Sequence, residues 1–560
     1  MTWGLAEREL ALRRAERDGL DLLVIGGGIT GAGVLRDAAS RGLRALVVER
    51  DDFASGTSSR SSKLIHGGLR YIGEGHLGLT REACRERDLL LRQNPHLVRT
   101  LPFLLPAYEG GKHPIWQVRA ALWTYAALAS FRSTARFRML RPDEIADYSR
   151  DLCQDGLRGA GLYHDAQVDD VRLVLETLRS ARALGGEAAN HAEVVELVRG
   201  EDGTLEAARV RDALTGRIWV LRAHVFVNAA GAGVERIRGL DRPVAEPELR
   251  PAKGVHLVIP RSRIHAQGAV AFPAPDGRQL FLVPWNEVSL IGTTDTFTNE
   301  IDEPSVLIEE VHYLLAAANE AFPRVGLTTN DLRSVFAGVR PLVASAGTKA
   351  PPSSVSREHR MYRDPSGLIS AAGGKLTTYR AMGEAIVDLV LARLPRERRA
   401  AAGPSRTAAL ALREDAFARP AFEAELRARF DVSPARAAQL VRTYGAAAER
   451  LLAEAPAELR GPIGSSRFTW AEVPWVMRTE CPVTLCDLLE RRLRLALFAE
   501  GQGLRDLDRL ARVAGETAGW DAERIRAEAS AYAAAVRRHY QIVPPRPAQA
   551  VPAGARSAAA

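Results

Sequence analysis

Residues 21–33 read DLLVIGGGITGAG, a short apolar run that leads directly into a glycine-rich turn. The run from Leu22 to Ile25 predicts a buried strand, and the small residues from Ile29 to Ser40 predict a helix. A second apolar run, Ala45 to Val48, predicts the next strand. This order of elements is a β-α-β unit, which favours an α/β fold.

The glycines of this turn form a dinucleotide-binding fingerprint. Gly26, Gly28 and Gly31 have G-x-G-x-x-G spacing, and Glu49 ends the next predicted strand roughly 20 residues later. The first two glycines allow a tight turn and a close approach to a pyrophosphate, and the third lets helix and strand pack closely. Glu49 can accept hydrogen bonds from ribose hydroxyls and disfavours the extra phosphate of NADP. The fingerprint alone fits FAD and NAD equally well.

Later segments predict a second, antiparallel sheet and a helical region. QLFLVPWNEVSLIGTTD is typical of a hairpin with Asn286 and Glu287 near its turn. After about Leu394 the composition shifts to Ala, Arg, Glu and Leu with helical periodicity. We expect the following regions: an oxidoreductase region at 18–394, with a discontinuous Rossmann-like part at about 18–100, 160–250 and 335–394 and an antiparallel part mainly at 251–335; a helical C-terminal domain at 400–541; and a disordered tail at 542–560.

The composition limits the partners of the chain. A net charge of +8 and a pI near 9.5 suit an anionic substrate, an anionic membrane surface or nucleic acid. The arginines are scattered through helical stretches without a basic block or an aromatic platform, so nucleic-acid binding is not expected. The sequence lacks both an apolar run of roughly 20 residues and a secretory signal, so we expect a cytoplasmic protein with only peripheral membrane contact. Four cysteines without C-x-x-C spacing predict neither a metal site nor a disulfide framework.

A loop after the second strand resembles part of a known family. TSSRSSKLIHGGLRYI, Thr57 to Ile72, is similar to the flavin-contacting loop of the FAD-dependent glycerol-3-phosphate dehydrogenases, within the D-amino-acid oxidase-like superfamily. Further matches follow in the family's order: YHDAQVDDVRLVL, KGVHLVIPR, VPWNEVSLIGTTD, FAGVRPL and AAGGKLTTYRAM. The resemblance implies that the cofactor is FAD. It also implies a Rossmann-like FAD domain, an antiparallel substrate domain over the flavin, and an all-α C-terminal cap containing VMRTECPVTLCDLLERRLRLAL.

The activity that this resemblance implies is the oxidation of sn-glycerol 3-phosphate to dihydroxyacetone phosphate. Hydride would pass to FAD, and the electrons would then pass to a membrane quinone, either ubiquinone or menaquinone. Because quinones live in lipid, we expect peripheral attachment to the inner face of the cell membrane, helped by the positive charge of the chain. The sequence leaves the electron acceptor, the quinone site and a homodimer open.

Oxidation of a secondary alcohol by a flavin needs an anion site for the phosphate, a hydride acceptor and a base for the hydroxyl proton. The resemblance places phosphate-binding arginines at Arg340 and Arg357, with Arg70 and Tyr71 nearby and Thr294 as a further substrate-site candidate. Apolar neighbours in FAGVRPL predict that Arg340 is buried. A buried arginine needs an anion.

Two further residues are candidates for the reaction itself. His256 lies on a predicted strand, where a core histidine would fit equally well, but the resemblance turns it toward the substrate as a general base. Lys375 corresponds to the family's lysine near flavin N5, where a cation would favour the reduced, anionic flavin. The residues expected to contact the cofactor are Gly26, Gly28, Gly31, Glu49, Thr57, Ser61, Ser62, Lys63, Gly67, Gly68, Gly233, Gly374, Lys375, Leu376 and Thr377.

Three alternative functions remain open from the sequence. The first is a glycerol-3-phosphate oxidase, which would use oxygen as the acceptor and share the substrate site. The second is an amine or amino-acid oxidase of the same superfamily, which would not need phosphate-binding arginines. The third is a flavin-binding protein without turnover, in which the helical C-terminal domain would be the functional part.

Overall fold

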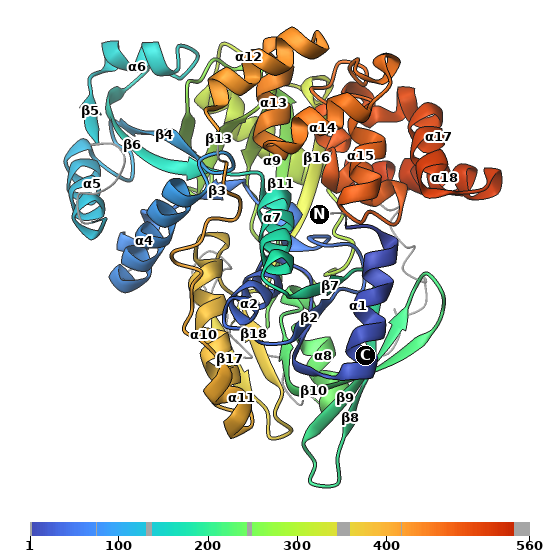
Figure 1. Ribbon diagram of the computed structural model, residues 1–560. Coiled ribbons are helices and arrows are strands. Elements are labelled where there is room, and N and C mark those ends of the chain that lie inside the picture. The colour runs from blue at the N-terminus through green and yellow to red at the C-terminus, as the bar shows by residue number, and fades with distance from the viewer. Residues whose placement is uncertain are drawn as a thin grey trace, which may run out of the picture.

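Two β-sheets and a C-terminal group of helices make up the computed structural model (Figure 1). The structure describes residues 3–73, 75–129, 137–243, 249–343, 359–415 and 417–542. The predicted tail therefore lies almost entirely outside the described residues. The α/β fold with an added antiparallel sheet and a helical C-terminal domain is confirmed.

The first sheet is the predicted Rossmann-like sheet. Among the described residues its strand order is β17-β18-β10-β1-β2-β7, and the five strands from β18 to β7 run parallel. The strands β8 and β9 extend β10 as an antiparallel ribbon. The bounds are β1 (Leu20–Ile25), β2 (Ala45–Val48), β7 (Glu187–Ala189), β8 (Ala192–Arg199), β9 (Leu205–Asp212), β10 (Ile218–Asn228), β17 (Arg360–Arg363) and β18 (Ile369–Ala372).

Helices cover both faces of this sheet because its central strands are apolar on both sides. Three helices pack against one face and share one apolar core with β1 and β2: α2 (Ile29–Ser40), α7 (Asp170–Ala183) and α10 (Tyr379–Leu391). The other face packs against α1 (Leu5–Asp18), α8 (Val234–Asp241) and the ribbon of β8 and β9. The parallel strands therefore end at one common edge, where ligands bind in such sheets.

The helices α2 and α10 cross at a point where neither has a side chain. A Cβ atom added to Gly383 would lie 2.7 Å from the carbonyl carbon and oxygen of Gly33, and a Cβ added to Gly33 would lie 2.9 Å from the carbonyl oxygen of Tyr379. The two backbones therefore touch directly. This contact places the start of α10 beside the start of α2, so the two glycine turns that precede these helices line the same cavity.

The second sheet is mostly antiparallel and carries the predicted hairpin. Its order is β15-β11-β14-β13-β12-β4-β6-β3, with β16 paired to β11 and β5 paired to β6. The hairpin of β13 and β14 turns at Asn286, as expected. The bounds are β3 (Leu64–Ile65), β4 (Arg99–Tyr108), β5 (Arg138–Leu140), β6 (Leu157–Gln167), β11 (Ala252–Pro260), β12 (Ala269–Pro273), β13 (Gln279–Trp285), β14 (Val288–Gly292), β15 (Thr296–Phe297) and β16 (Ser334–Arg340).

The extent of this second sheet differs from the sequence prediction. Residues 160–167 and 335–340 were expected in the Rossmann-like part, but they lie in β6 and β16 of the second sheet. The reason is long-range pairing, since β6 pairs with β4 and β16 pairs with β11. Local composition carries no signal for such pairing, because an apolar strand can join either sheet.

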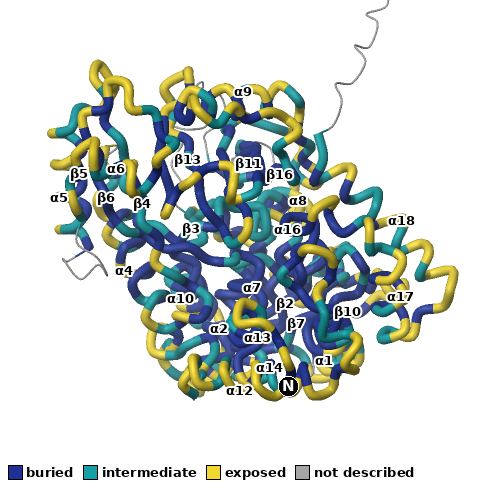
Figure 2. The backbone as a smooth tube through the Cα atoms, turned by 90° about the horizontal axis from the view of Figure 1, so that it is seen from above, coloured by how far each residue is buried: buried dark blue, intermediate teal, exposed yellow. Residues whose placement is uncertain are grey.

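Helices border the second sheet on both faces. One face packs against α9 (Ile308–Ala321). At its far end lie α4 (Leu77–Gln93), α5 (Ile115–Leu128), α6 (Pro142–Tyr148) and the short α3 (Arg70–Gly73), and Figure 1 shows α4 and α5 at the outer edge of the molecule, away from the C-terminal helices. In Figure 2 buried backbone fills the centre of the molecule, and exposed backbone is concentrated at its rim.

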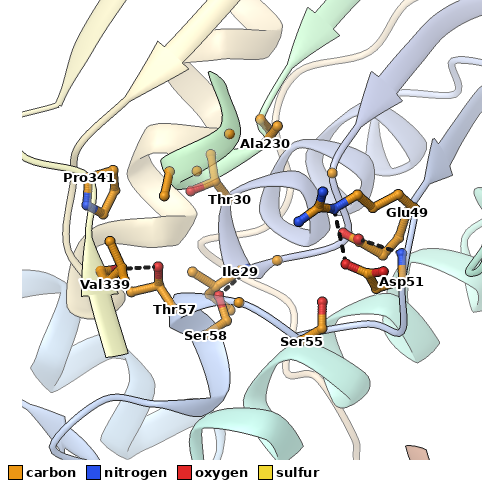
Figure 3. Close-up of a pocket in the computed structure, with 18 of the residues that line it drawn as sticks. Ile29, Thr30, Glu49, Asp51, Ser55, Thr57, Ser58, Ala230, Val339 and Pro341 are labelled. Atoms are coloured by element: carbon orange, nitrogen blue, oxygen red, sulfur yellow. Dashed lines mark hydrogen bonds and ion pairs between the residues drawn. The ribbon is translucent and has the colours of Figure 1, made fainter. Parts of the chain in front are cut away.

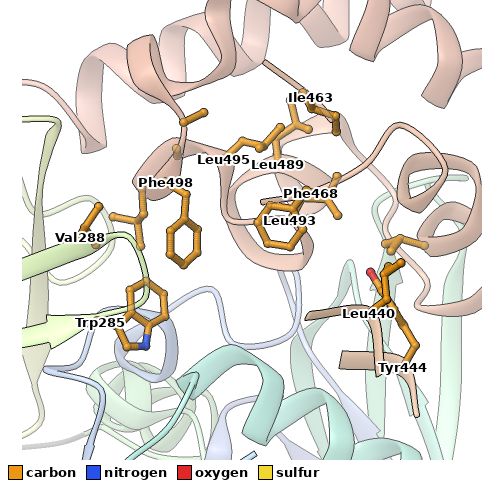
Figure 4. Packing of buried hydrophobic residues seen from close by; sticks show 14 of the residues in the cluster. Trp285, Val288, Leu440, Tyr444, Ile463, Phe468, Leu489, Leu493, Leu495 and Phe498 are labelled. Carbon is orange, nitrogen blue, oxygen red and sulfur yellow. The ribbon is translucent and has the colours of Figure 1, made fainter. Parts of the chain in front are cut away.

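The C-terminal helices pack onto the hairpin of the second sheet. Phe498 stacks on Trp285 with ring centroids 4.6 Å apart, and Phe468 meets Phe498 edge-on (Figure 4). Buried aromatic pairs of this kind contribute about 0.5–1.5 kcal/mol beyond their area. The bounds are α11 (Arg396–Ala401), α12 (Arg419–Phe430), α13 (Pro434–Tyr444), α14 (Ala447–Glu454), α15 (Glu472–Thr479), a π-helical turn (Asp487–Arg492), α16 (Leu495–Phe498), α17 (Leu507–Ala518) and α18 (Ala522–His539).

The helix crossing predicts a specific effect of one methyl group. The variant Gly383→Ala should lower the free energy of unfolding by about 1–3 kcal/mol, because the new Cβ meets backbone atoms that cannot rotate away. The matched control is Gly239→Ala in α8, where a Cβ meets no atom within 4 Å and helix propensity rises. Urea unfolding of the FAD-loaded protein measures both. Equal stability of the two variants would contradict the prediction.

Candidate active site

A cavity of about 640 Å³ lies at the edge where the parallel strands end. It reaches from the ends of β1 and β2 across to β16 of the second sheet, so both sheets form its walls (Figure 3). A long cavity at this edge suits an extended dinucleotide. The predicted cofactor residues that line it are Gly26, Gly28, Glu49, Thr57, Ser61, Gly233, Gly374, Lys375 and Leu376.

The glycine turn brings the start of a helix to the wall of the cavity. Gly26 has a φ of 114°, and a Cβ there would lie 2.6 Å from the carbonyl oxygen of Ala229. The helix α2 begins immediately after the turn, and the Ile29 N–H donates to Ser58 Oγ at 3.0 Å beside the cavity (Figure 3). The partial positive charge of this helix start favours an anion. The turn therefore fits the dinucleotide that its spacing predicts.

Glu49 lies at the opposite end of the cavity wall from Thr57 (Figure 3). Its carboxylate accepts hydrogen bonds from the Gly27 N–H at 2.6 Å and from the Asp51 N–H at 3.0 Å. Burial raises the pKa of Glu49, and the two N–H donors oppose that shift. The backbone thus holds the carboxylate in the position from which a ribose would be bound.

The loop after β2 forms the wall between the two sheets. Thr57 Oγ1 donates to the carbonyl of Val339 at 2.6 Å, which ties this loop to β16. Ser61 Oγ donates to Asp170 at 2.7 Å. The fully buried Lys63 Nζ also lies 2.6 Å from Asp170, and burial lowers the pKa of Lys63 to about 8 against the pull of that carboxylate. The Lys63 side chain therefore supports the loop from behind the cavity.

Several other predicted cofactor residues also lie behind the wall. Gly67 donates its N–H to Tyr125 Oη at 3.0 Å, and the His66 N–H donates to Thr377 Oγ1 at 3.1 Å. These contacts hold the loop in place without exposing the groups to the cavity. The predicted residues that are described but do not line this cavity are Gly31, Ser62, Lys63, Gly67, Gly68 and Thr377.

His256 is a buried, neutral histidine on β11. Its Nε2 lies 2.8 Å from Ser62 Oγ, and its ring stacks on Phe336 with centroids 4.8 Å apart. Burial lowers the pKa of His256 to about 3, with Arg340 and Lys63 adding to the effect. The imidazole is therefore neutral across the physiological range, and the low pKa makes it a weak base while the site holds no anion. Its Nδ1 is buried without a hydrogen-bond partner among the described residues.

Arg340 reaches from the end of β16 over the same face of β11. A Cβ added to Gly254 would lie 2.5 Å from its Nη2, and residues 254 and 256 share one face because side chains alternate along a strand. The guanidinium donates to Asp295 at 2.9 Å and to the carbonyl of Thr294 at 3.3 Å. The anion that a half-buried Arg340 requires is thus supplied in part by Asp295, and His256 lies beside the pair.

Lys375 connects the cavity to two of the predicted substrate residues, Tyr71 and Arg70. It lines the cavity, and its Nζ lies 3.6 Å from the ring centroid of the buried Tyr71. Arg70 is exposed, and its guanidinium lies 5.7 Å from the same ring. Arg357 lies outside the described residues.

The C-terminal domain contributes wall residues that the sequence did not reveal. Asp52, in the loop after β2, pairs with Arg491 and Arg492, and His191 pairs with Asp487 at 2.9 Å. Asp487 holds the pKa of His191 above its usual value, although burial opposes this. These charged residues lie more than 400 positions after Asp52 and belong to no sequence motif. The sequence shows only that charged residues are frequent in CDLLERR. The cavity residues from this domain are Asp487, Glu490, Arg491 and His539.

Family comparisons agree with this geometry. Residues 21–389 match the model for FAD dependent oxidoreductases, and residues 405–525 match the C-terminal domain of alpha-glycerophosphate oxidase. The chain is therefore an FAD-dependent oxidoreductase, and FAD is its cofactor.

Individual relatives define the family more closely. The aerobic glycerol-3-phosphate dehydrogenase of Bacillus subtilis (strain 168) is 38% identical over 402 residues, 72% of each chain. That of Staphylococcus haemolyticus is 37% identical over 399 residues, 71% of each chain. The glycerol-3-phosphate dehydrogenase from Bacillus halodurans, solved with FAD, is 29% identical with a TM-score of 0.77, covering 95% of this chain and 97% of that one. This chain belongs to the FAD-dependent glycerol-3-phosphate dehydrogenase family, which confirms the resemblance.

More distant structures share only the fold. The L-alpha-glycerophosphate oxidase from Mycoplasma pneumoniae, solved with FAD bound, is 17% identical with a TM-score of 0.52, covering 66% of this chain and 94% of that one. A search of the described residues for a helix long and apolar enough to cross a membrane identifies none.

The position of Glu49 predicts a defect in cofactor retention. The variant Glu49→Ala should weaken FAD binding by roughly 10- to 100-fold, because one hydrogen bond to a charged group is worth about 1.5–3 kcal/mol. The FAD affinity of Glu49→Gln should lie between that of Glu49→Ala and that of the wild type, since glutamine keeps one acceptor oxygen. Release of fluorescent FAD on dilution measures the affinity. The control is Glu196→Gln, an exposed residue paired with Arg209. Unchanged FAD retention in Glu49→Ala would contradict the assignment.

Proposed function

We propose that this protein oxidises sn-glycerol 3-phosphate to dihydroxyacetone phosphate and passes the electrons to a membrane quinone. The observation that carries the proposal is the pairing on one face of β11: the Arg340 guanidinium lies over Gly254, beside the neutral imidazole of His256. An anion site next to a base is what a phosphorylated alcohol requires. Two relatives are named aerobic glycerol-3-phosphate dehydrogenases.

Each residue has a distinct role in this proposal. FAD, when bound, supplies the acceptor for the hydride from C2 of the substrate. Arg340 binds the substrate phosphate, exchanging part of its contact with Asp295 for a second anion. His256 takes the hydroxyl proton, and the Phe336 ring fixes the plane of the imidazole. The substrate phosphate on Arg340 would offset the positive charge that, after burial, lowers the pKa of His256, and so would strengthen this base. Lys375 places a cation between the cofactor cavity and Tyr71.

The names of the relatives support a dehydrogenase, and the charge of the chain supports contact with a membrane, where quinones are dissolved. The relatives are dehydrogenases by name, and the net charge of +8 would draw the protein to an anionic membrane face without a spanning helix. We therefore place the protein peripherally at the inner face of the cell membrane. One observation favours oxygen as the acceptor: residues 405–525 match a domain described from alpha-glycerophosphate oxidase.

Anaerobic addition of glycerol 3-phosphate to the FAD-loaded protein tests the proposal. The flavin absorbance should bleach, and a soluble quinone analogue should restore it faster than air-saturated buffer does. Stoichiometric peroxide on admission of air, with no faster turnover on added quinone, would assign an oxidase instead. A flavin that glycerol 3-phosphate cannot bleach would remove the activity altogether.

Arg340 and its counterion predict opposite effects on substrate affinity. Arg340→Ala should lower kcat/KM by at least about 100-fold, because a charge-assisted phosphate contact is worth roughly 3 kcal/mol. Asp295→Asn keeps the shape of the site and frees the guanidinium from a negative charge, so KM for glycerol 3-phosphate should fall. Steady-state kinetics with a soluble quinone measure both. An amine or amino-acid oxidase would show no dependence of glycerol 3-phosphate affinity on either change.

A further inference from the structure

The helix α5 presents an apolar face to solvent. Trp116 is 65% exposed and Trp123 is 56% exposed, the two most exposed large hydrophobic residues among those described. Arg119, Ala120 and Ala127 are also exposed, and the spacing of the five residues places them on one side of a helix. We call these five residues the α5 outer face. The helix lies at the edge of the molecule farthest from the C-terminal domain (Figure 1).

The opposite side of α5 is buried against β4 and β6, and its Tyr125 also contacts the Thr57 to Ile72 loop. Val118, Leu122 and Tyr125 are 1–4% exposed. Tyr125 Oη accepts the Gly67 N–H at 3.0 Å and donates to Asp165 at 2.6 Å. The helix also contacts α3, which carries Tyr71 under the Lys375 ammonium. One helix therefore connects an exposed apolar face directly to the loop beside the flavin site.

Basic side chains outnumber acidic ones around the α5 outer face. The helix sequence IWQVRAALWTYAAL contains Arg119 and neither Asp nor Glu. The neighbouring helix α4 exposes Arg81 and Arg85 and has Glu82 half-buried between them, and Lys112 is exposed just before α5. The exposed Glu109 before it is paired with Arg158. Tryptophan with flanking basic residues is the composition of helices that lie in the interface of a bilayer.

We propose that the α5 outer face is the surface by which this protein docks on an anionic phospholipid membrane. The proposal rests on the proposed quinone function, because a lipid-dissolved acceptor must reach the flavin from the bilayer. The two tryptophans enter the headgroup region, and Arg119 pairs with lipid phosphates. The membrane then lies against the helix that supports the Gly67 to Tyr71 loop, so docking and electron transfer use the same side of the molecule.

The main alternative occupant is a second copy of this chain. A two-fold interface repeats the same patch on both partners. The cationic side chains around Arg119 would then face their own copies, with no carboxylate on α5 to pair with them. An anionic bilayer offers them phosphate groups. Charge complementarity therefore favours the membrane.

Ala120 offers a matched pair of variants at the centre of the face. Ala120→Glu should lower binding to vesicles of phosphatidylglycerol and phosphatidylcholine by about tenfold, because it places a carboxylate against anionic lipid. Ala120→Lys, with a side chain of similar size, should bind at least as well as the wild type. Sedimentation of the FAD-loaded protein with vesicles measures both, with pure phosphatidylcholine vesicles as the low-affinity reference. Equal binding by both variants would overturn the proposal.

A second measurement separates membrane docking from self-association. Trp116→Ser should weaken vesicle binding, whereas the paired change Leu214→Ser with Ile218→Ser, at another exposed apolar site, should leave it unchanged. If both Ala120 variants instead convert a dimer to a monomer in sedimentation velocity, with vesicle binding unaffected, the face is an interface between copies and the proposal is wrong.

Activity assays keep this test independent of the proposed function. Ala120→Glu should reduce a soluble quinone analogue at the wild-type rate, yet lose turnover with a long-chain quinone embedded in vesicles. Failure of the proposed function would instead show as absent bleaching by glycerol 3-phosphate in every variant, whatever the vesicle binding. Equal turnover of wild type and Ala120→Glu with the embedded quinone would show that α5 does not orient the protein on the membrane.

Discussion

A Cβ atom at residue 31 would lie 1.9 Å from the carbonyl oxygen of Gly26, so only glycine fits there. The rest of the site depends on this close contact between β1 and α2. It lets α2 begin directly after the end of β1, so that Ile29 and Thr30 in its first turn line the cavity. Gly33 and Gly383 extend the same close packing to α10. Lys375 lies at the start of the short helical turn that leads into α10. Three glycine contacts thus place two glycine-rich turns, distant in sequence, around one cofactor.

Buried charge then joins the domains around that cofactor. Lys63, Asp170 and Arg494 are all fully buried and in contact, and they link the flavin loop, α7 and the C-terminal domain. Removing one member of such a set typically costs about 3–5 kcal/mol, because the remaining charge is left unpaired away from water. The same set supports Phe336 and the neutral His256, since the Lys63 ammonium lies over the Phe336 ring. The C-terminal domain is therefore part of the site as well as a cover.

The sequence prediction succeeded where chemistry is local. The strand, turn and helix around the glycine fingerprint and the hairpin at Asn286 each depend on residues close together in the chain, and the structure contains them. The cofactor contacts of Glu49 and Lys375 stay predictions. The sequence prediction was less accurate for the extent of the second sheet, and it did not show that the Lys63 side chain turns away from the cavity to Asp170. Both features depend on partners between about 50 and 107 residues away, which a motif does not record.

Sequence alone determined the class of cofactor site, because a tight turn, a helix start and a ribose-binding carboxylate follow from residue type and short spacing. Only the tertiary structure decided what surrounds that site. Strand pairing brought Arg340 over Gly254 beside His256, and desolvation made that histidine neutral. Packing also turned Tyr125 of α5 toward the Thr57 to Ile72 loop and left Trp116 and Trp123 more than half exposed. Burial and long-range pairing depend on the folded arrangement of the whole chain, so no local segment encodes them.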